Sequence, residues 1–429
     1  MLTKEQNDLL TRVEGDAPMG GIMRSHWLPV CMSEEVAEKD GPPVKSRLVG
    51  EDLVVFRDSN GKLGVLDEHC PHRGASLVFG RNEECGLRCL YHGWKFDVEG
   101  NILEMSSEPD GAALKGSLSQ KSYPVREAGG FVWAWLGAKD RMREFEPPAW
   151  APKPGIKYAI VKMHAACNWA QVLEGSIDSA HSSTLHSTNM PAAADVYGST
   201  ATDEAWLRPS NDKAPKLQFE PTPYGFRYAA LRKPIKDPET QQYVRTTLFI
   251  APFTVLIPPN NQYKLAQMLV PMDDVNTMFY WVAWHPDPKK GITQESWRRF
   301  CAATVGEDLN PDFTKKRTLL NMYMQDRAAM KSGDFTGIKG IPTQDMAMWE
   351  SMGPIADRSK DHPGSSDMAV VQFRRMMVGA AKKFAEGAPA IGTTGQIRHV
   401  QLASFEGIVP KTTDWRRLGA PADEAVTAK

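Results

Sequence analysis

The chain has 429 residues, with 51 lysines and arginines against 52 aspartates and glutamates, so its formal net charge is −1. This length predicts two domains or one large domain with ample core. The near-zero charge gives no indication of a nucleic-acid or anionic-membrane partner. No run of eighteen apolar residues is present, which argues against a membrane span.

The N-terminus and the cysteines favour a cytoplasmic location. Met1–Asp8 lacks the apolar stretch of a signal peptide. Two of the six cysteines belong to the motif described below. The other four are scattered without the spacing of a disulfide framework, which fits a reducing compartment: Cys31, Cys85, Cys167 and Cys301.

The first part of the chain, from about residue 25 to 140, is expected to form a small all-β module. Apolar runs at Leu53–Phe56 and Leu63–Leu66 flank Asp58–Gly61, a strong hairpin signal. Further strands are expected at Trp94–Asp97, Asn101–Leu103 and Phe131–Leu136.

A proline-rich stretch, Glu146–Gly155, is typical of a linker and predicts domains at 1–150 and 151–429. The second part contains both helix-like and strand-like apolar patterns, which indicates an α+β fold. Helices are expected at 168–187, 313–331 and 366–386, and strands at Phe226–Leu231, Thr246–Ile257, Tyr263–Val270 and Met278–Trp284. A loop is expected from Ser187 to Asp203, and the polar end Ala420–Lys429 is expected to be loose.

Two short Cys/His pairs lie on the expected β module. They are Cys70-Pro-His72 and Cys89-Leu-Tyr-His92, with sixteen residues between His72 and Cys89. Two thiolates on one iron and two imidazoles on the other form the ligand set of a Rieske [2Fe–2S] centre. Because imidazoles are neutral, they raise the reduction potential above that of an all-cysteine cluster. We interpret the motif as a one-electron relay.

A zinc site is the alternative for these residues. Zinc sites usually pair cysteine with cysteine and histidine with histidine at short spacings, whereas here each cysteine is followed by its own histidine. Cys85 also lies near the motif, but only Cys89 carries a histidine three residues on. The Rieske interpretation is therefore preferred.

A second candidate metal site follows at Asp178-Ser-Ala-His181-Ser-Ser-Thr-Leu-His186. Two histidines five residues apart differ by about 140° on a regular helix, so the helix must bend or end between them to serve one ion. Two histidines and one carboxylate on one side of the metal are the ligands of mononuclear iron(II) oxygenases. The alternative, two polar histidines on a helix surface, loses weight beside a Rieske motif.

Together, Cys-Pro-His-Arg-Gly, Cys-x-Tyr-His-Gly-Trp and Asp-x2-His-x4-His resemble the oxygenase component of Rieske non-haem iron oxygenases. The resemblance covers most of the chain. It implies an N-terminal Rieske domain and a catalytic domain in which an antiparallel sheet is flanked by helices around the iron. In that family, a segment like Gln344-Asp345-x4-Glu350 supplies the carboxylate, which implies Asp345 as third ligand beside His181 and His186. Asp326 and Asp357 remain open alternatives.

The resemblance also implies a role for Asp178. In such proteins an aspartate at this position bridges a cluster histidine, here His72 or His92, to the iron histidine His181 of a neighbouring subunit. A carboxylate bonded to both imidazoles fixes their tautomers and couples the two metal sites. A homotrimer, or a hexamer of stacked trimers, is therefore expected. The alternative for Asp178 is a water-facing residue in the first turn of a helix.

Parts of the chain resemble the phthalate 4,5-dioxygenase branch of the family: Glu14–Gly20 with Ser25–Pro29, and Ile341–Pro354. The resemblance implies addition of dioxygen to an aromatic dicarboxylate, giving a cis-dihydrodiol. Electrons would come from NADH through a separate flavin and ferredoxin-type reductase. No Gly-x-Gly-x-x-Gly fingerprint occurs here, so the nicotinamide is expected to bind elsewhere.

An aromatic dicarboxylate requires cations in an apolar pocket, and arginine binds carboxylates through its planar fork. Arg208 follows the loop after the candidate histidines, and Arg245 opens an apolar strand. We predict both as substrate-binding residues, with Arg227 and Arg232 in reserve. The alternative for each is a solvated arginine.

Two other functions stay open. A monooxygenase or O-demethylase of the same family, or a dioxygenase for isophthalate or chlorobenzoate, would share every metal ligand. An electron-transfer Rieske protein would need no second iron and would hold two rather than three irons per chain.

Overall fold

The structure, a computed structural model, describes residues 1–109, 115–151, 155–194, 206–258, 263–287, 289–394, 396–419 and 426–427. It divides into two compact units. The small unit comprises Val13–Asp16 and Met23–Phe145, and the large unit comprises Met1–Arg12, Ala17–Ile22 and Glu146–Lys429. This division differs from 1–150 and 151–429 at its start, because helix α1 (Lys4–Thr11) packs on the long C-terminal helix of the large unit.

The small unit is built from three antiparallel sheets. Their strands are β1 (Trp27–Met32), β10 (Phe131–Trp135) and β9 (Val125–Ala128), then β2 (Val44–Leu48), β3 (Glu51–Arg57) and β4 (Leu63–Asp67), and last β5 (Arg81–Glu83), β6 (Gly86–Arg88), β7 (Trp94–Phe96) and β8 (Ile102–Met105). The predicted hairpin joins β3 to β4. Gly61 closes it at φ 83°, donating its N–H to the Asp58 carbonyl at 2.8 Å.

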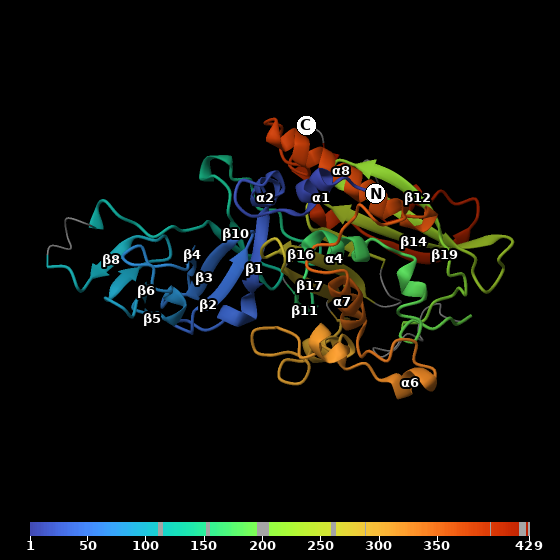
Figure 1. The fold of residues 1–429 in the computed structure, drawn as a ribbon, viewed down its shortest axis with the longest axis horizontal. Coiled ribbons are helices and arrows are strands. Elements are labelled where there is room, and N and C mark those ends of the chain that lie inside the picture. Colours follow the sequence, from blue (N-terminus) through green and yellow to red (C-terminus); the bar gives the residue numbers. More distant parts are fainter. Residues whose placement is uncertain are drawn as a thin grey trace. The chain divides into compact units, whose positions relative to one another are not determined.

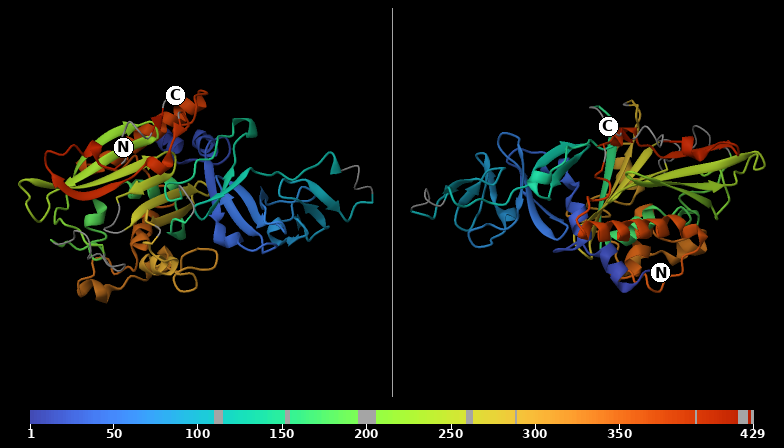
Figure 2. Two further views of the ribbon diagram at one scale, coloured as in Figure 1. Left: turned by 180° about the vertical axis from the view of Figure 1, so that it is seen from behind. Right: turned by 90° about the horizontal axis from the view of Figure 1, so that it is seen from above.

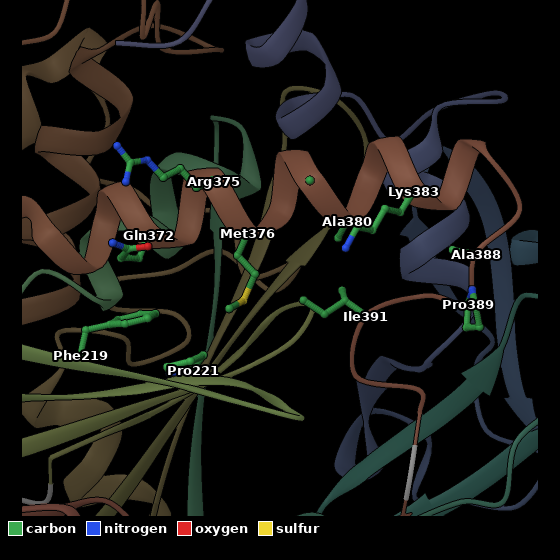
Figure 3. A pocket seen from close by; sticks show the side chains of 11 residues that line it. Phe219, Pro221, Gln372, Arg375, Met376, Ala380, Lys383, Ala388, Pro389 and Ile391 are labelled. Carbon is green, nitrogen blue, oxygen red and sulfur yellow. The ribbon is translucent and has the colours of Figure 1, made fainter.

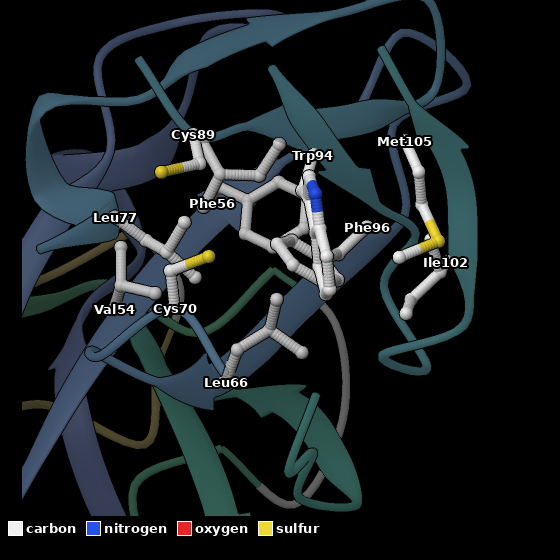
Figure 4. Packing of buried hydrophobic residues seen from close by; sticks show 11 residues of the cluster. Val54, Phe56, Leu66, Cys70, Leu77, Cys89, Trp94, Phe96, Ile102 and Met105 are labelled. Carbon is white, nitrogen blue, oxygen red and sulfur yellow. The ribbon is translucent and has the colours of Figure 1, made fainter. Parts of the chain in front are cut away.

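The core of the small unit lies directly beneath the candidate cluster residues. Figure 4 shows the Cys70 and Cys89 side chains beside Phe56, Leu77 and Trp94. Val54 and Phe56 of β3 and Leu66 of β4 belong to this core, and the neighbouring residues of both strands are also buried, so both faces of this sheet are covered. The two cysteines are therefore held in place by the packed hydrophobic core of this unit.

The large unit is organised around one antiparallel sheet of eight strands. In spatial order these are β11 (Tyr158–Ala165), β17 (Thr277–Trp284), β16 (Lys264–Pro271), β15 (Thr254–Ile257), β14 (Gln241–Ile250), β13 (Gly225–Arg232) and β12 (Lys216–Thr222), with β19 (Phe405–Pro410) also paired to β14. The predicted strand Thr246–Ile257 is interrupted at Ala251–Phe253 and forms parts of β14 and β15. The predicted α+β fold is confirmed.

Helices pack against this sheet (Figures 1 and 2). Helix α4 (Trp169–Ser176) contacts β15 and β16, and α7 (Ile341–Ser351) packs on α4. Helix α8 (Met368–Ala385) contacts β12, with Phe373 against Trp169 and Phe249. The remaining helices of the described residues are α2 (Pro18–Arg24), α5 (Gln294–Phe300) and α6 (Arg327–Lys331). Within the described residues, no helix is long and apolar enough to cross a bilayer.

Two predicted helices are wrong in extent. The helix expected at 168–187 ends at Ser176, before either candidate histidine. Of the helix expected at 313–331, only α6 and a 3-10 segment at Leu319–Met324 form. Within that segment Met322 and Tyr323 have positive φ, and the Tyr323 hydroxyl donates to the buried carboxylate of Glu350. This tertiary contact outweighs local helix propensity. Parts of the expected loop to Asp203 and of the expected loose end at Ala420–Lys429 lie outside the described residues.

Candidate metal centres and substrate cavity

The four candidate cluster residues lie on two turns of similar construction. Cys70 follows β4, and Cys89 with His92 lie between β6 and β7. In each turn a glycine four residues after the cysteine donates its N–H to the cysteine carbonyl: Gly74 to Cys70 at 2.9 Å and Gly93 to Cys89 at 3.0 Å. Both glycines have φ near 75°, at 73° and 75°, a conformation that favours glycine.

These turns bring two thiols and two imidazoles together. Cys70 and Cys89 are each 2% exposed. Burial raises the pKa of the Cys70 thiol to about 11, although the N–H groups of His72 and Arg73 act in the opposite direction. The rings of His72 and His92 lie 4.4 Å apart, and Trp94 stacks on His72 at 4.7 Å. Paired thiols with backbone N–H donors and paired imidazoles fit a [2Fe–2S] cluster.

Cys85 is placed elsewhere. It lies in the turn between β5 and β6, where the side chain of Asn60 donates to its sulfur at 3.0 Å. The sequence argument against it as a cluster ligand agrees with this position.

The large unit brings His181, His186 and Asp345 into one cluster. His181 begins a 3-10 turn after α4, His186 follows that turn, and Asp345 lies in α7. Asp345 Oδ1 is 3.0 Å from His186 Nε2 and 3.4 Å from His181 Nε2, and the two Nε2 atoms are 3.2 Å apart. Three donors that share one ion at about 2.1 Å and right angles lie about 3 Å apart. The geometry therefore fits a two-histidine, one-carboxylate metal site.

The charge of this cluster also fits a cation. Burial raises the pKa of Asp345, but the two imidazoles outweigh burial and hold it at about 2. Burial lowers the pKa of His181, but Asp178 and Asp345 outweigh burial and raise it to about 10. The buried, ionised carboxylate of Asp345 is thus stabilised by positive charge beside it, which a bound metal or a proton on His181 supplies.

The two alternative aspartates have other partners. Asp326 caps α6, accepting the N–H groups of Ala328 and Ala329 at 2.8 and 2.9 Å. Asp357 is exposed and accepts from Ser359. Neither belongs to the cluster of His181, His186 and Asp345.

Asp178 lies directly behind His181. Its Oδ1 accepts the N–H of Ala180 at 2.8 Å, and its Oδ2 lies 3.6 Å from His181 Nδ1. Burial raises the pKa of its carboxyl, but the contact with His181 outweighs burial and keeps it below the usual value. The carboxylate is therefore ionised and faces the nitrogen of His181 that points away from the cluster.

A cavity of about 80 Å³ opens beside these residues. One wall is the sheet, where Arg245 and Thr247 share a face of β14 and Gln267 of β16 pairs with Trp281 of β17. Trp349 of α7 forms part of the opposite wall. It packs so closely on Gly175 of α4 that a Cβ there would lie 2.1 Å from the indole nitrogen. The cavity is thus lined by three tryptophans, Trp206, Trp281 and Trp349, and by a larger number of polar side chains.

The structure groups three arginines near this cavity. Arg245 lines it and is bound by Glu406 of β19, at 2.8 Å. Arg208 donates to the hydroxyls of Ser183 and Ser182 at 2.9 and 3.1 Å, and Arg232 shares Ser183 at 3.3 Å. Arg208 and Arg232 are each 3% exposed.

The arginine group is short of negative charge. In the part of the chain that the structure describes, Arg245 has a carboxylate partner, whereas Arg208 donates to two hydroxyls and to the sulfur of Met190. Arg208 Nε and Arg232 Nη1 are buried and have no hydrogen-bond partner among the described residues. Burial, together with the neighbouring arginines, lowers the pKa of both guanidinium groups, that of Arg232 to about 10. Such a group favours an anion.

Several residues of the site were not identified from the sequence: Gln267, Trp281, Gln344, Trp349 and Glu406. Gln344 and Trp349 lie in the α7 segment that the sequence analysis quoted only for Asp345 and for its family resemblance, whereas Gln267, Trp281 and Glu406 lie on three different strands that no motif marks. One further lining residue was accessible from the sequence. Side chains two positions apart on a strand share a face, so Thr247 could have been predicted to lie beside Arg245 in the cavity.

A larger groove of about 580 Å³ lies between α8 and β12 (Figure 3). Phe219 and Met376 line it, with Arg375 and Lys383 at its rim. None of its lining residues is a histidine, cysteine, aspartate or glutamate. The described residues that line it therefore lack the usual metal-binding side chains, whereas His181, His186 and Asp345 line the smaller cavity.

Two family models match the chain. The Rieske [2Fe-2S] domain matches residues 26–124, and the LigXa C-terminal domain like model matches residues 134–429. The chain belongs to the Rieske non-haem iron oxygenases. The predicted cofactors of this family, a Rieske [2Fe–2S] cluster and mononuclear iron with dioxygen as co-substrate, are thereby confirmed.

Among its relatives is the phthalate 4,5-dioxygenase oxygenase subunit of Pseudomonas putida, 56% identical over 416 residues, covering 97% of this chain and 94% of that protein. Another is the 3-chlorobenzoate-3,4-dioxygenase oxygenase subunit of Comamonas testosteroni, 34% identical over 430 residues, with 96% of each covered. A solved structure of an NdmA mutant of Pseudomonas putida CBB5 with caffeine has 17% identity, covers 92% of this chain and 98% of that chain, and gives a TM-score of 0.57. This last likeness shows a shared fold.

Proposed function

We propose that the protein is the oxygenase component of a dioxygenase that converts phthalate to a cis-dihydrodiol. The balanced reaction adds dioxygen and two hydrogens to the ring, with NADH and a proton giving NAD⁺. The 56% identity to the phthalate 4,5-dioxygenase oxygenase subunit, over nearly the whole chain, carries this proposal. The cavity beside the candidate iron site supports it.

The metal ligands are part of the proposal. Cys70, His72, Cys89 and His92 hold the cluster, and His181, His186 and Asp345 hold the mononuclear iron. When bound, the two groups supply single electrons and an open position for dioxygen. The chain itself would hold the ring between the sheet and Trp349, where Trp206 and Trp281 add apolar contact area beside the polar lining groups.

The arginine group is suited to the two carboxylates of the substrate. Arg245 lines the cavity, and Arg208 lies behind Ser182, a lining residue. A dianion would compensate guanidinium charge that Glu406 leaves unbalanced. We assign Arg208 and Arg245 as the carboxylate-binding residues, with Arg232 supporting Arg208 through their shared contact with Ser183.

The protein is further proposed to work as a homotrimer or stacked-trimer hexamer, with a separate NADH-dependent flavin and ferredoxin-type reductase, in the cytoplasm. Asp178 would join His181 to a cluster histidine of the neighbouring subunit. Its ionised carboxylate already faces the outer nitrogen of His181. All six cysteines are free of disulfides, which agrees with a reducing compartment.

The reaction can be tested by oxygen uptake with a matched reductase and NADH. The panel contains phthalate, isophthalate, terephthalate, 3-chlorobenzoate and a methoxybenzoate, with products identified by mass. Phthalate should be consumed with one NADH per dioxygen, giving a product heavier by two oxygens and two hydrogens. A phenol with formaldehyde from the methoxybenzoate would show a demethylase instead. Coupled turnover of another acid with none of phthalate would reject phthalate as the substrate.

The arginine assignment can be tested separately. Arg208→Gln and Arg245→Gln should each weaken phthalate binding by about 10- to 100-fold, because a charge-assisted hydrogen bond contributes about 1.5–3 kcal/mol. Arg227→Gln is the matched control. Arg227 is a buried arginine of β13, but it binds Glu220 and the carbonyl of Arg416. Unchanged phthalate binding in either test variant would show that arginine to be structural.

A further inference from the structure

We infer that Gln344 is a positioning residue for the mononuclear metal: its side chain fixes the proton of His186 on Nδ1 and so reserves Nε2 for the ion. This inference deepens the proposed metal site, and it is independent of which aromatic acid is the substrate.

The geometry places Gln344 directly behind His186. Gln344 precedes Asp345 in α7 and is 1% exposed. Its Oε1 lies 2.7 Å from His186 Nδ1, while His186 Nε2 faces Asp345 Oδ1 and His181 Nε2. One imidazole nitrogen therefore faces the amide and the other faces the ligand cluster.

The orientation of the amide follows from its other contacts. Gln344 Nε2 lies 2.9 Å from the carbonyl oxygen of Ile338 and 3.0 Å from Asn189 Oδ1. A backbone carbonyl can only accept, so the nitrogen of the amide must face Ile338 and the oxygen must face His186. The amide oxygen can only accept as well, and His186 Nδ1 must therefore donate. In a neutral imidazole, Nε2 then carries a lone pair.

The consequence concerns the space between the ligands. Nε2 of His186, as a bare acceptor, lies 3.0 Å from a carboxylate oxygen of Asp345, which is itself an acceptor. Two acceptors at this distance repel one another unless a cation lies between them. Gln344 thus turns His186 into a ligand that is ready for a metal before the metal arrives.

His181 is held differently. Its Nδ1 is buried, has no hydrogen-bond partner in the described part of the chain, and lies 3.6 Å from Asp178 Oδ2. The two histidines consequently have unlike supports, a hydrogen-bonded neutral amide for His186 and a more distant carboxylate for His181. Fixing of the tautomer by a tight contact belongs to His186 alone.

Gln171 provides a matched control. It is also a buried glutamine, 2% exposed, and its side chain also makes three hydrogen bonds. Its partners are the carbonyls of Trp349 and Gly353 and the N–H of Ala356, at 2.8–2.9 Å. Gln171 supports the end of α7, but none of its hydrogen bonds reaches a candidate metal ligand.

The experiment compares Gln344→Leu, Gln344→Glu and Gln171→Leu in the full-length protein. Iron(II) affinity is measured anaerobically by competition with a chelator, the Co(II)-substituted site is examined by its visible spectrum, and the cluster absorbance and Tm are recorded as checks on folding. Gln344→Leu should weaken iron binding about 10- to 100-fold and change the Co(II) spectrum. Gln344→Glu still accepts from Nδ1 and should bind iron within about threefold of the parent. Gln171→Leu should lower the Tm without changing the affinity.

Parental affinity and an unchanged Co(II) spectrum in Gln344→Leu would overturn the inference. A loss of affinity in Gln171→Leu as large as in Gln344→Leu would do the same, because packing of α7 would then explain both. If Gln344→Leu does not fold, Gln344→Glu decides alone. That variant loses both donors but keeps the acceptor, so loss of iron from the folded protein would reject a role in fixing the tautomer.

Discussion

The two candidate metal centres are built in opposite ways. The cluster residues all lie between Cys70 and His92, on two neighbouring turns that glycine N–H groups close in the same manner. The iron-site residues extend from His181 to Asp345 and meet because α7 packs on α4. The first centre is thus a local feature of a small β unit, whereas the second requires a complete folded unit.

Their surroundings differ as well. Leu90 and Tyr91, next to His92, are 58% and 57% exposed, whereas His186 and Asp345 are 3% and 6% exposed. An electron relay must come close to another protein, but oxygen chemistry requires an enclosed site. Cys70 and Cys89 are themselves 2% exposed, so the cluster centre differs from the iron site in its exposed turn residues and not in the burial of its cysteines.

Among substitutions that affect only one of the two centres, we expect the largest loss of iron and turnover at the cluster. Cys70→Ser should remove about two irons per chain, the Rieske electron paramagnetic resonance signal and all NADH-driven turnover, since a serine cannot replace the thiolate. Iron analysis and spectroscopy measure this directly. Cys85→Ser is the control and should retain the cluster. If Cys70→Ser and Cys85→Ser retained the same amount of cluster iron, the assignment of Cys70 as a cluster ligand would be wrong.

The next effect is at the buried centre. Asp345→Ala should remove about one iron per chain and stop turnover, while the visible spectrum of the cluster stays unchanged. Asp326→Ala should instead cost about 0.5–2 kcal/mol of stability through the lost helix cap and keep all its iron. If Asp345→Ala retained all its iron, Asp345 would not be the third ligand, and Asp326 and Asp357 would have to be tested in its place.

A smaller effect is expected from a substitution that slows electron transfer between the two centres while both keep their iron. Asp178→Asn is expected to keep both metals but to lower turnover about 100-fold, because the neutral amide no longer supports the imidazole of His181. Single-turnover reduction and reoxidation of the cluster would locate the defect. Undiminished product formation would show that Asp178 does not couple the two sites.

The mildest test uses pH. In the metal-free protein the pKa of His181 is raised to about 10, above its usual value near 6.5, so His181 keeps a proton at pH 7–8. This proton stabilises the fold fully below about pH 6.5, and the contribution is lost as pH rises through about 10. Iron(II) must displace the proton, so its affinity should rise about tenfold per pH unit from 7 to 8. A flat anaerobic affinity profile would show that His181 is already unprotonated.

The sequence predicts what depends on neighbouring residues. The Asp58–Gly61 hairpin and the Cys/His pairs are readable because a few adjacent positions determine them. The helix expected at 168–187 could not be bounded correctly, because its end at Ser176 is accompanied by long-range contacts such as the hydrogen bond from the Tyr228 hydroxyl to the Ile177 carbonyl.

Residues defined by long-range contacts are harder still to identify. Asp345 could be named only beside two alternatives, because spacing says nothing about which aspartate reaches the histidines. Gln344 was seen only as part of a motif, since its role depends on the carbonyl of Ile338 and on Asn189. Glu406 was missed, because its partner Arg245 lies 161 positions away.

The pairing of β19 with β14 has a consequence for how substrate preference can diverge. Glu406, the carboxylate that balances Arg245, comes from a peripheral strand that supplies none of the candidate metal ligands. Substitutions in that strand can alter the charge presented to an aromatic acid while the iron-binding scaffold stays intact. Charge at the proposed carboxylate-binding arginines and the candidate iron ligands can therefore be changed independently of one another.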